Sequence, residues 1–332
     1  MRKLLILLLL IPSLCYGDGW FYSVPSGAAP AAATTTLGPY ELGSLNVDSH
    51  TGNTAIVDDA LNGGGPAGDW TGFVVEITAG TGSGSATITG WDDGTDTVTV
   101  GAGLTDVADN DTFKIRCEYQ TLSSSEGDGN IQDAYVISSA PDNHASGGET
   151  LRCENDTGTP HYCYPLWYVN FIAGPIDASD TINSASLYCY ITSVLWAPAT
   201  DYDIVVGKLI DGSASPDATV WSYLGLTQAA GGATYNNRDE TPTVEWEADS
   251  GTAITDVIPS AVESPATTIL GSADSTWTSW NIASLVTDWV TDGDNNIGFY
   301  MRNTEADGQP MYVGSQKNST TSYRWFIVVE YQ

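Results

Sequence analysis

The stretch Thr276–Asn303, TWTSWNIASLVTDWVTDGDNNIGFYMRN, decides the fold of this chain because it holds the clearest helical period after residue 17. Apolar residues recur in it at i, i+3, i+4, i+7 and i+8, a spacing that places side chains on one face of a helix. These residues are Ile282, Leu285, Val286, Trp289 and Val290. Asn281 or Ser284 is suited to cap the start of this helix, and the Asp292-Gly293 turn is suited to end it.

The sequence on both sides of this helix follows the period of β-strands. Ile297, Phe299 and Met301 alternate with their neighbours, as side chains on the two faces of a strand do. Similar short runs, separated by turns rich in Gly, Asp and Asn, fill most of the remaining chain. The pattern predicts an all-β protein: a C-terminal jelly-roll β-sandwich with one short helix, preceded by a small antiparallel β-meander or barrel domain.

The first residues have the features of a secretion signal. Arg2-Lys3 is basic, Leu4–Ile11 is apolar, and Cys15 and Gly17 are small residues before a cleavage position after Gly17. The apolar run is too short to span a bilayer. We therefore expect a secreted or surface-exposed protein that is not inserted in a membrane.

Composition divides the rest of the chain. The segment 121–130, TLSSSEGDGN, has the composition of a flexible linker. The Ala/Pro/Thr run before residue 46 has no period and indicates an extended spacer. The predicted segments are 1–17 signal peptide, 18–45 Ala/Pro/Thr-rich spacer, 46–120 small β domain, 121–130 linker and 131–332 β-sandwich.

The charge of the chain restricts its partners. It has 41 Asp and Glu against 10 Lys and Arg, a net charge of −31. Nucleic acids and anionic membranes attract basic surfaces, so we expect neither as a partner. Calcium, a neutral sugar and solubility in salty water remain as explanations of the acidity. Most of the acids lie in loops, where turn formation and a solvated surface are the simpler account.

The cysteines that follow the signal are Cys117, Cys153, Cys163 and Cys189. An even number in an exported chain favours disulfides. Cys153 and Cys163 flank a polar loop, ENDTGTPHY, and are predicted to bridge the two arms of a hairpin. Cys117 and Cys189 then either pair with each other across the domains or remain free.

The sequence does not point to catalysis. A hydrolase needs a positioned nucleophile and base, or two carboxylates at a set separation. There is no G-x-S-x-G motif, and the histidines are His50, His144 and His161. His161 lies between Cys153 and Cys163, but one histidine with C-x9-C does not match a zinc pattern. We expect no enzyme activity and no cofactor, with calcium as the alternative.

Aromatic side chains are the candidates for ligand binding. Aromatic faces stack on the apolar faces of sugars, beside polar groups that bond hydroxyls. The candidate carbohydrate-binding residues are Trp167, Trp196, Trp221, Tyr235, Asn237, Arg238 and Trp246. The alternative for each tryptophan is packing in the core. Asp292, Asp294 and Asn296 are the candidate calcium ligands, and a turn that stops the helix is the alternative there.

Several segments of residues 131–332 resemble one family in the right order. They are DAYV (133–136), LWYVNF (166–171), TINSASLYCYI (181–191), the helical stretch with Trp289, and FIVVEY (326–331). This part is similar to the DNRLRE-type domain, a carbohydrate-binding-module-like β-sandwich of secreted and surface proteins. Asn281 and Tyr235 stand where that family has Asp and Trp. The resemblance implies a β-sandwich and a role in surface attachment.

Residues 72–100 with 109–115 resemble a small β-module of phage virion proteins. A Gly-rich turn, GTGSG, leads to an isoleucine strand, an acidic-Gly turn and a valine strand. The module brings no catalytic residues. It implies a structural part of a virion and partners in self-assembly.

Three functions follow, in this order. The first is a secreted, non-catalytic surface-attachment or carbohydrate-binding protein, whose partner is a polysaccharide or cell-surface glycan. The alternative is a structural virion protein, such as a tail fibre or capsid decoration. A polysaccharide-degrading enzyme comes last.

Overall fold

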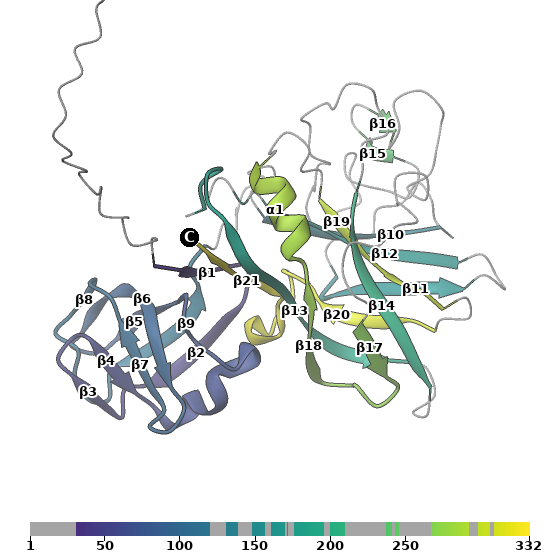
Figure 1. Cartoon of the computed structure of the whole chain (residues 1–332). Coiled ribbons are helices and arrows are strands. Elements are labelled where there is room, and N and C mark those ends of the chain that lie inside the picture. The colour runs from purple at the N-terminus through teal and green to yellow at the C-terminus, as the bar shows by residue number, and fades with distance from the viewer. Residues whose placement is uncertain are drawn as a thin grey trace, which may run out of the picture. The chain divides into compact units, whose positions relative to one another are not determined.

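The computed structural model describes residues 31–119, 131–138, 148–156, 161–169, 171, 176–195, 200–209, 237–240, 243–245, 267–291, 298–305 and 309–332. Among these residues the structure is built of antiparallel strands, with one α-helix and short 3₁₀ segments (Figure 1). The predicted all-β class is confirmed, and the jelly-roll connectivity stays a prediction. Ala32–Gln332 form one compact unit.

Two sheets form the larger part, which we call the sandwich. The first sheet contains β1 (Ala33–Leu37), β21 (Phe326–Tyr331), β13 (Ile182–Val194), β20 (Met311–Gly314), β11 (Thr150–Asp156) and β18 (Thr276–Asn281). The second contains β10 (Ile131–Ile137), β12 (His161–Val169), β19 (Phe299–Asn303), β14 (Asp201–Lys208) and β17 (Thr267–Leu270). β11 joins them, since it pairs with β20 in its first half and with β12 in its second. β15 (Asn237–Glu240) and β16 (Thr243–Glu245) pair only with each other among the described strands.

Alternation along the strands creates the core of the sandwich. In β13, Leu187, Cys189 and Ile191 are buried, while the residues between them are half-exposed. Side chains of the second sheet complete the same core, including Trp167 and Phe299. The burial of these apolar side chains is the main stabilising term of the fold.

The helix predicted from the opening stretch is confirmed as α1 (Ala283–Thr291). Leu285, Val286, Trp289 and Val290 are all buried in the sandwich core. The side chain of Asn281 caps the helix, because its Oδ1 accepts the amide of Ala283 at 3.0 Å.

The second part, which we call the small module, is one curved antiparallel sheet. Its strands are β2 (Glu41–Asn46), β3 (Ser49–Thr51), β4 (Ala55–Val57), β5 (Phe73–Ala79), β6 (Ser83–Asp92), β7 (Thr97–Val100), β8 (Leu104–Thr105) and β9 (Thr112–Cys117), with a 3₁₀ segment η1 (Asp59–Ala67). Side chains alternate in burial along β9: Phe113, Ile115 and Cys117 are buried, and the intervening residues are half-exposed.

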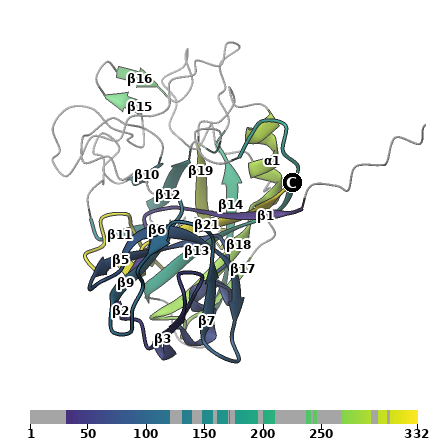
Figure 2. The ribbon, with the colours of Figure 1, turned by 90° about the vertical axis from the view of Figure 1, so that its left-hand side faces the viewer.

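The small module is inserted into the sandwich between its first two strands. β1 lies beside β21, and the chain then enters β2 of the small module (Figure 2). The module ends next to where it began: the amide of Gly38 donates to the carbonyl of Tyr119, and the amide of Tyr119 donates to the carbonyl of Thr36. β1 and the start of β2 lie in the residues that the sequence suggested as a spacer. Their partners, β21 and β9, are distant in the chain, so no local period reveals them.

The two parts share packed side chains. Phe326 of β21 belongs to the core of the small module, and Tyr188, Trp277 and Val328 pack against that core from the sandwich. Tyr40 of the module lies 5.0 Å from the ring of Phe326. The outer face of the first sheet is therefore partly covered by the small module.

Candidate functional site

Trp167 lies in the core and not on a surface. Its side chain has 0% exposure. The ring stacks on Phe299 with centroids 5.5 Å apart and meets Trp325 edge-on at 6.5 Å. A sugar stacks only on a ring face that solvent can reach. The predicted sugar-binding role of Trp167 is therefore wrong, and its strand period reflects core packing.

The other predicted ligand residues stay predictions. Trp196, Trp221, Tyr235, Trp246, Asp292, Asp294 and Asn296 lie outside the described residues. Asn237 and Arg238 lie in β15, where the backbone of Asn237 pairs with Glu245, and the structure does not describe their side chains.

The predicted disulfides are wrong, since all four cysteines of the described chain are buried thiols. Glu154, and not Cys153, lies opposite Cys163, and Cys163 Sγ is 3.8 Å from Glu154 Oε2. Side chains alternate along a strand, so Cys153 points to the other face of β11 from Glu154. Cys117 and Cys189 belong to the two separate cores, and both are free thiols, which was the second of the two alternatives for this pair.

Three aromatic side chains meet on the outer face of the first sheet, and we call them the outer aromatic cluster. Tyr190 of β13 lies opposite Trp277 of β18. Tyr323 comes from the short 3₁₀ turn η5 (Thr321–Tyr323) between β20 and β21. The rings of Tyr190 and Tyr323 are parallel within 5°, with centroids 4.0 Å apart, and Trp277 meets Tyr190 edge-on at 5.6 Å.

The outer aromatic cluster is partly open to solvent. Tyr323 is 37% exposed, and Tyr190 and Trp277 are half-buried. On its inner side, Trp277 packs against Tyr40 at 5.8 Å and against Phe326 at 5.4 Å. The cluster is therefore held from below and presents aromatic surface outward.

Two of these three rings carry hydroxyl groups. A hydrogen bond with the Tyr190 side chain raises the pKa of Tyr323 above its usual value. Arg324 follows Tyr323 in the chain and interacts electrostatically with Glu41 of β2. The arrangement combines apolar ring surface with hydrogen-bonding groups, which is what recognition of a sugar requires.

The sequence period contained part of this cluster. In β13, Tyr188 and Tyr190 alternate with the buried Leu187, Cys189 and Ile191, and aromatic residues on the outward face of a strand are a signal of surface contact. No local pattern predicts that Tyr323 joins the cluster, because it lies in the turn η5, far from β13 in the chain.

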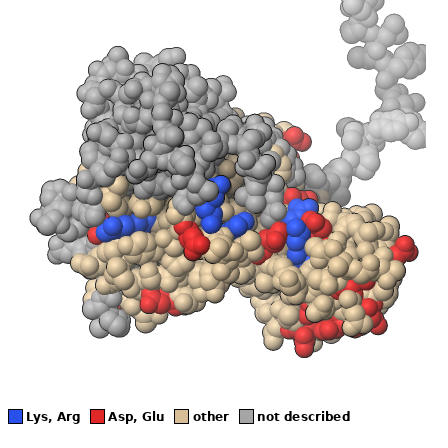
Figure 3. Space-filling view, turned by 180° about the vertical axis from the view of Figure 1, so that it is seen from behind, with Lys and Arg blue, Asp and Glu red and all other residues tan. Residues whose placement is uncertain are grey.

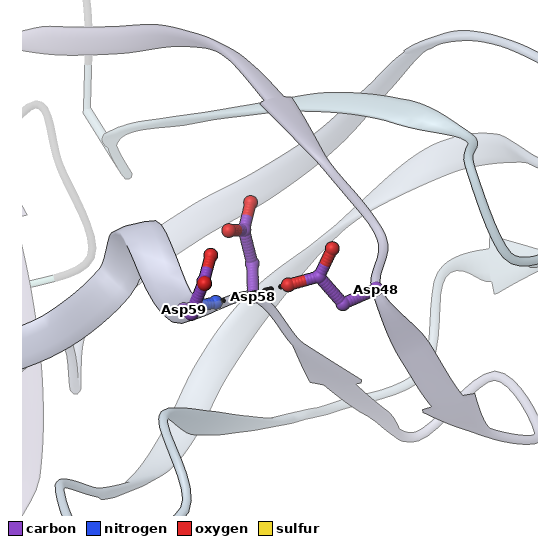
Figure 4. Close-up of side chains that lie close together, drawn as sticks. All are labelled: Asp48, Asp58 and Asp59. Atoms are coloured by element: carbon purple, nitrogen blue, oxygen red, sulfur yellow. Dashed lines mark hydrogen bonds between the residues drawn. The ribbon is translucent and has the colours of Figure 1, made fainter.

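A group of carboxylates lies in the small module, formed by Asp48, Asp58 and Asp59 (Figure 4). Their oxygens are within 4.8 Å of one another, close enough to hold a divalent ion. Backbone amides already use several of them: Asp58 accepts from Ala60 at 2.8 Å and from Asn46 at 3.0 Å. Asp48 accepts from the amide of Asp59 at 3.1 Å. Burial raises the pKa of Asp58. We assign the group to capping the start of η1.

Acidic side chains are spread over the small module, on the right in Figure 3, and basic ones are few there. Lys114 is 3.1 Å from Glu41, and Arg116 is 2.7 Å from Glu76. Acids thus offset both of these cations, and the surface of the module is negative.

The chain matches no protein-family model, and a search of curated proteins finds no match to it. In the described part of the chain, no helix has the length and apolar character needed to cross a membrane.

Proposed function

We propose that the protein is a secreted, non-catalytic carbohydrate-binding protein that attaches to a glycan surface. The observation that carries this proposal is the outer aromatic cluster, in which Tyr323 exposes part of its side chain over the stacked ring of Tyr190. Ring faces of this kind pack on the C–H faces of pyranoses, and neighbouring polar groups bond the hydroxyls. The resemblance of residues 131–332 to a carbohydrate-binding-module-like sandwich supports the same function.

The charge favours a neutral glycan. At a net charge of −31, the protein repels polyanions such as sulfated or uronic-acid polymers at low ionic strength. The proposed ligand is therefore a neutral polysaccharide or cell-surface glycan, and no metal takes part in stacking.

A binding role also agrees with the chemistry of the buried thiols. Burial raises the pKa of the Cys163 thiol to about 12, so it stays protonated near neutral pH. The thiolate is the nucleophilic form of cysteine. Cys163 and its neighbour Glu154 are therefore poorly suited to act as a catalytic pair.

Affinity electrophoresis tests the proposed function. Folded protein is run through gels that contain dextran, laminarin or xyloglucan, with and without calcium. We expect retardation in at least one gel, and Tyr323→Ala should weaken binding about fivefold, since an aromatic contact contributes about 1 kcal/mol. The matched control is Tyr162→Ala, because Tyr162 is half-buried and, like Tyr323, stacks on another tyrosine, Tyr164, on β12.

Two results would contradict the proposal. Free migration of the native protein in every gel would remove the glycan-binding function. If Tyr162→Ala weakened binding as much as Tyr323→Ala does, the outer aromatic cluster would not be the binding site.

A structural role in a virion is the second candidate. It is favoured by the tight connection of the small module, whose two ends are bonded to each other at Gly38 and Tyr119. A rigid insertion of this kind suits a component of a particle. Detection of the protein in purified virions by mass spectrometry would support this role, and its consistent absence from them would exclude it.

A further inference from the structure

Asp133 is a buried carboxylate of the sandwich. It lies in β10 and is 2% exposed. Its Oδ2 accepts two hydrogen bonds, from the amide of Gln316 at 2.5 Å and from the indole Nε1 of Trp325 at 2.6 Å. Gln316 and Trp325 are the two ends of one segment, 316–325, which joins β20 to β21. One oxygen atom thus fixes both ends of this segment.

The 316–325 segment carries Tyr323 of the outer aromatic cluster. Within the segment, Arg324 Nε donates to the carbonyl of Asn318 at 2.9 Å, and the amide of Tyr323 donates to the carbonyl of Thr320 at 2.9 Å. Thr321 also donates its hydroxyl to the carbonyl of Glu41 in the small module at 2.9 Å. The position of Tyr323 over Tyr190 therefore depends on how firmly the segment is held.

We propose that Asp133 is a positioning residue for the outer aromatic cluster: it holds the 316–325 segment closed when protonated, and its ionisation loosens the segment and weakens sugar binding. This inference rests on the proposed function of the cluster. It adds a regulation by pH that acts through a residue remote from the ligand.

Hydrogen bonds and nearby cations offset only part of the effect that burial has on the pKa of Asp133. Desolvation raises the pKa of Asp133 to about 6, against the lowering effects of its two hydrogen bonds and of Lys317 and Arg324. Cys189 faces Asp133 from β13, and the negative charge of Asp133 helps to keep that thiol protonated. Glu41 of β2 faces Arg324. Both cations belong to the segment, so they move with it when it opens.

The direction in which pH acts on the 316–325 segment follows from the linkage between protonation of Asp133 and closure of the segment. The closed segment binds a proton on Asp133 more tightly than an open segment does, because an open segment lets water reach the carboxylate. Stabilisation of the closed form is therefore complete below about pH 4 and is lost as the pH rises through about 6. A difference of about two units in pKa corresponds to a change of roughly 100-fold in the opening equilibrium.

Hydrogen exchange tests the closing of the segment without any sugar. Exchange of the Gln316 amide and the Trp325 indole is followed by NMR between about pH 4 and 7.5, and corrected for intrinsic exchange rates. We expect the opening constant to rise about 100-fold over this range, while amides of β13 change less. Asp133→Asn keeps an acceptor oxygen but cannot ionise, so its opening constant should not depend on pH.

Two further variants serve as controls. Asp274→Asn alters an exposed carboxylate that accepts the amide of Val194, and it should leave the profile of the 316–325 segment unchanged. Lys317→Gln removes a cation that favours ionised Asp133, and it should move the midpoint to higher pH. The second variant keeps the test decisive if Asp133→Asn does not fold.

Affinity gels at about pH 5 and 7.5 test the link to the ligand. Native protein should be retarded more strongly at pH 5, by up to roughly tenfold if opening abolishes binding, and Asp133→Asn should be retarded equally at both values. A pH-independent opening constant in the native protein, or an unchanged pH profile in Asp133→Asn, would overturn the positioning role. If the exchange profile appears but no gel retards the protein at any pH, the glycan-binding function fails while the closing of the segment stands.

Discussion

At the scale of single residues, Asp111 shows how a buried carboxylate can organise loops. Its oxygens accept the amides of Thr81, Gly82 and Ala108 at 2.7 to 2.9 Å. The sequence indicated only turns at Gly80–Gly84 and at Asp109–Asp111. The structure shows that one side chain of the second turn closes the first. A Cβ on Gly80 would meet the Asp111 carboxylate, which accounts for glycine at that position.

Asp111 should make the small module sensitive to acid. Hydrogen bonds from backbone amides, that of Ala108 foremost, lower the pKa of Asp111 below its usual range. Its stabilisation is therefore present above about pH 4 and is lost as the pH falls through the lowered value. We expect Asp111→Ala to lower the urea midpoint at pH 7 and to differ little from the native protein near pH 2.

The control for this prediction is Asp109→Ala, since the side chain of Asp109 is 61% exposed. It should leave the urea midpoint almost unchanged at both pH values. Equal losses for Asp109→Ala and Asp111→Ala would show that the amide contacts of Asp111 do not stabilise the module.

Two buried tryptophans offer a matched comparison of hydrogen bonding. The indole Nε1 of Trp280 donates to the carbonyl of Ile204 at 3.1 Å. The indole Nε1 of Trp289 is buried and has no acceptor in the described part of the chain. Changing either tryptophan to Phe removes a similar volume. The difference between the two losses in the free energy of unfolding therefore isolates the contribution of the hydrogen bond.

We expect Trp280→Phe to reduce the free energy of unfolding by about 1 kcal/mol more than Trp289→Phe does. Denaturation in urea, followed by circular dichroism, measures both changes. A larger loss for Trp289→Phe would mean that packing, and not the bond to Ile204, separates the two sites.

At the scale of elements, the helix α1 shows which local signals were sufficient. Its apolar face was readable from Thr276–Asn303 because the spacing of Leu285, Val286 and Trp289 is a property of the sequence alone. Two residues were suited to cap it, Asn281 and Ser284. The structure gives the capping hydrogen bond to Asn281, because β18 ends there and places its side chain beside the amide of Ala283.

The contribution of the Asn281 cap to the free energy of unfolding should be measurable. Asn281→Ala should lower the free energy of unfolding by about 1 kcal/mol, because the amide of Ala283 loses its acceptor. Asn281→Asp should retain most of the stability, since a carboxylate accepts the same bond and favours the positive end of the helix. Urea denaturation of both variants tests this, and a similar loss in the two would contradict the capping role.

At the scale of the whole molecule, the insertion of the small module ties the two cores together. Gly38 lies where the chain leaves β1, with φ of +142° and the backbone of Trp325 and Phe326 close by. A Cβ there would lie 2.8 Å from the Cα of Phe326. Only glycine fits this crossing without displacing β21. A substitution that strains the backbone at Gly38 should therefore destabilise both the sandwich and the small module.

We expect the native protein to unfold in one cooperative transition by calorimetry, because Phe326 belongs to both a sandwich strand and the core of the small module. Gly38→Ala should lower the midpoint of this single transition, with a loss of about 1–3 kcal/mol. Gly43→Ala is the control, since a Cβ there meets nothing within 4 Å. Two separate transitions in the native protein would contradict the coupling.

The sequence by itself determined the all-β class and the helix α1, because each depends on a period within a few residues. It did not determine the faces of the cysteines or the burial of Trp167. The first depends on the pairing register of β11 with β12, and the second on which sheet covers the face of β12.

Only the tertiary structure decided what could serve as a site. The pairing of β1 with β21 makes the small module an insertion, and the 316–325 segment brings Tyr323 onto Tyr190 and Trp277. These contacts join residues that are far apart in the chain, so no local pattern could reveal them. The buried position of Asp133 has the same origin: its sequence neighbours suggest an ordinary strand, and only the folded chain surrounds its carboxylate with the two ends of one segment.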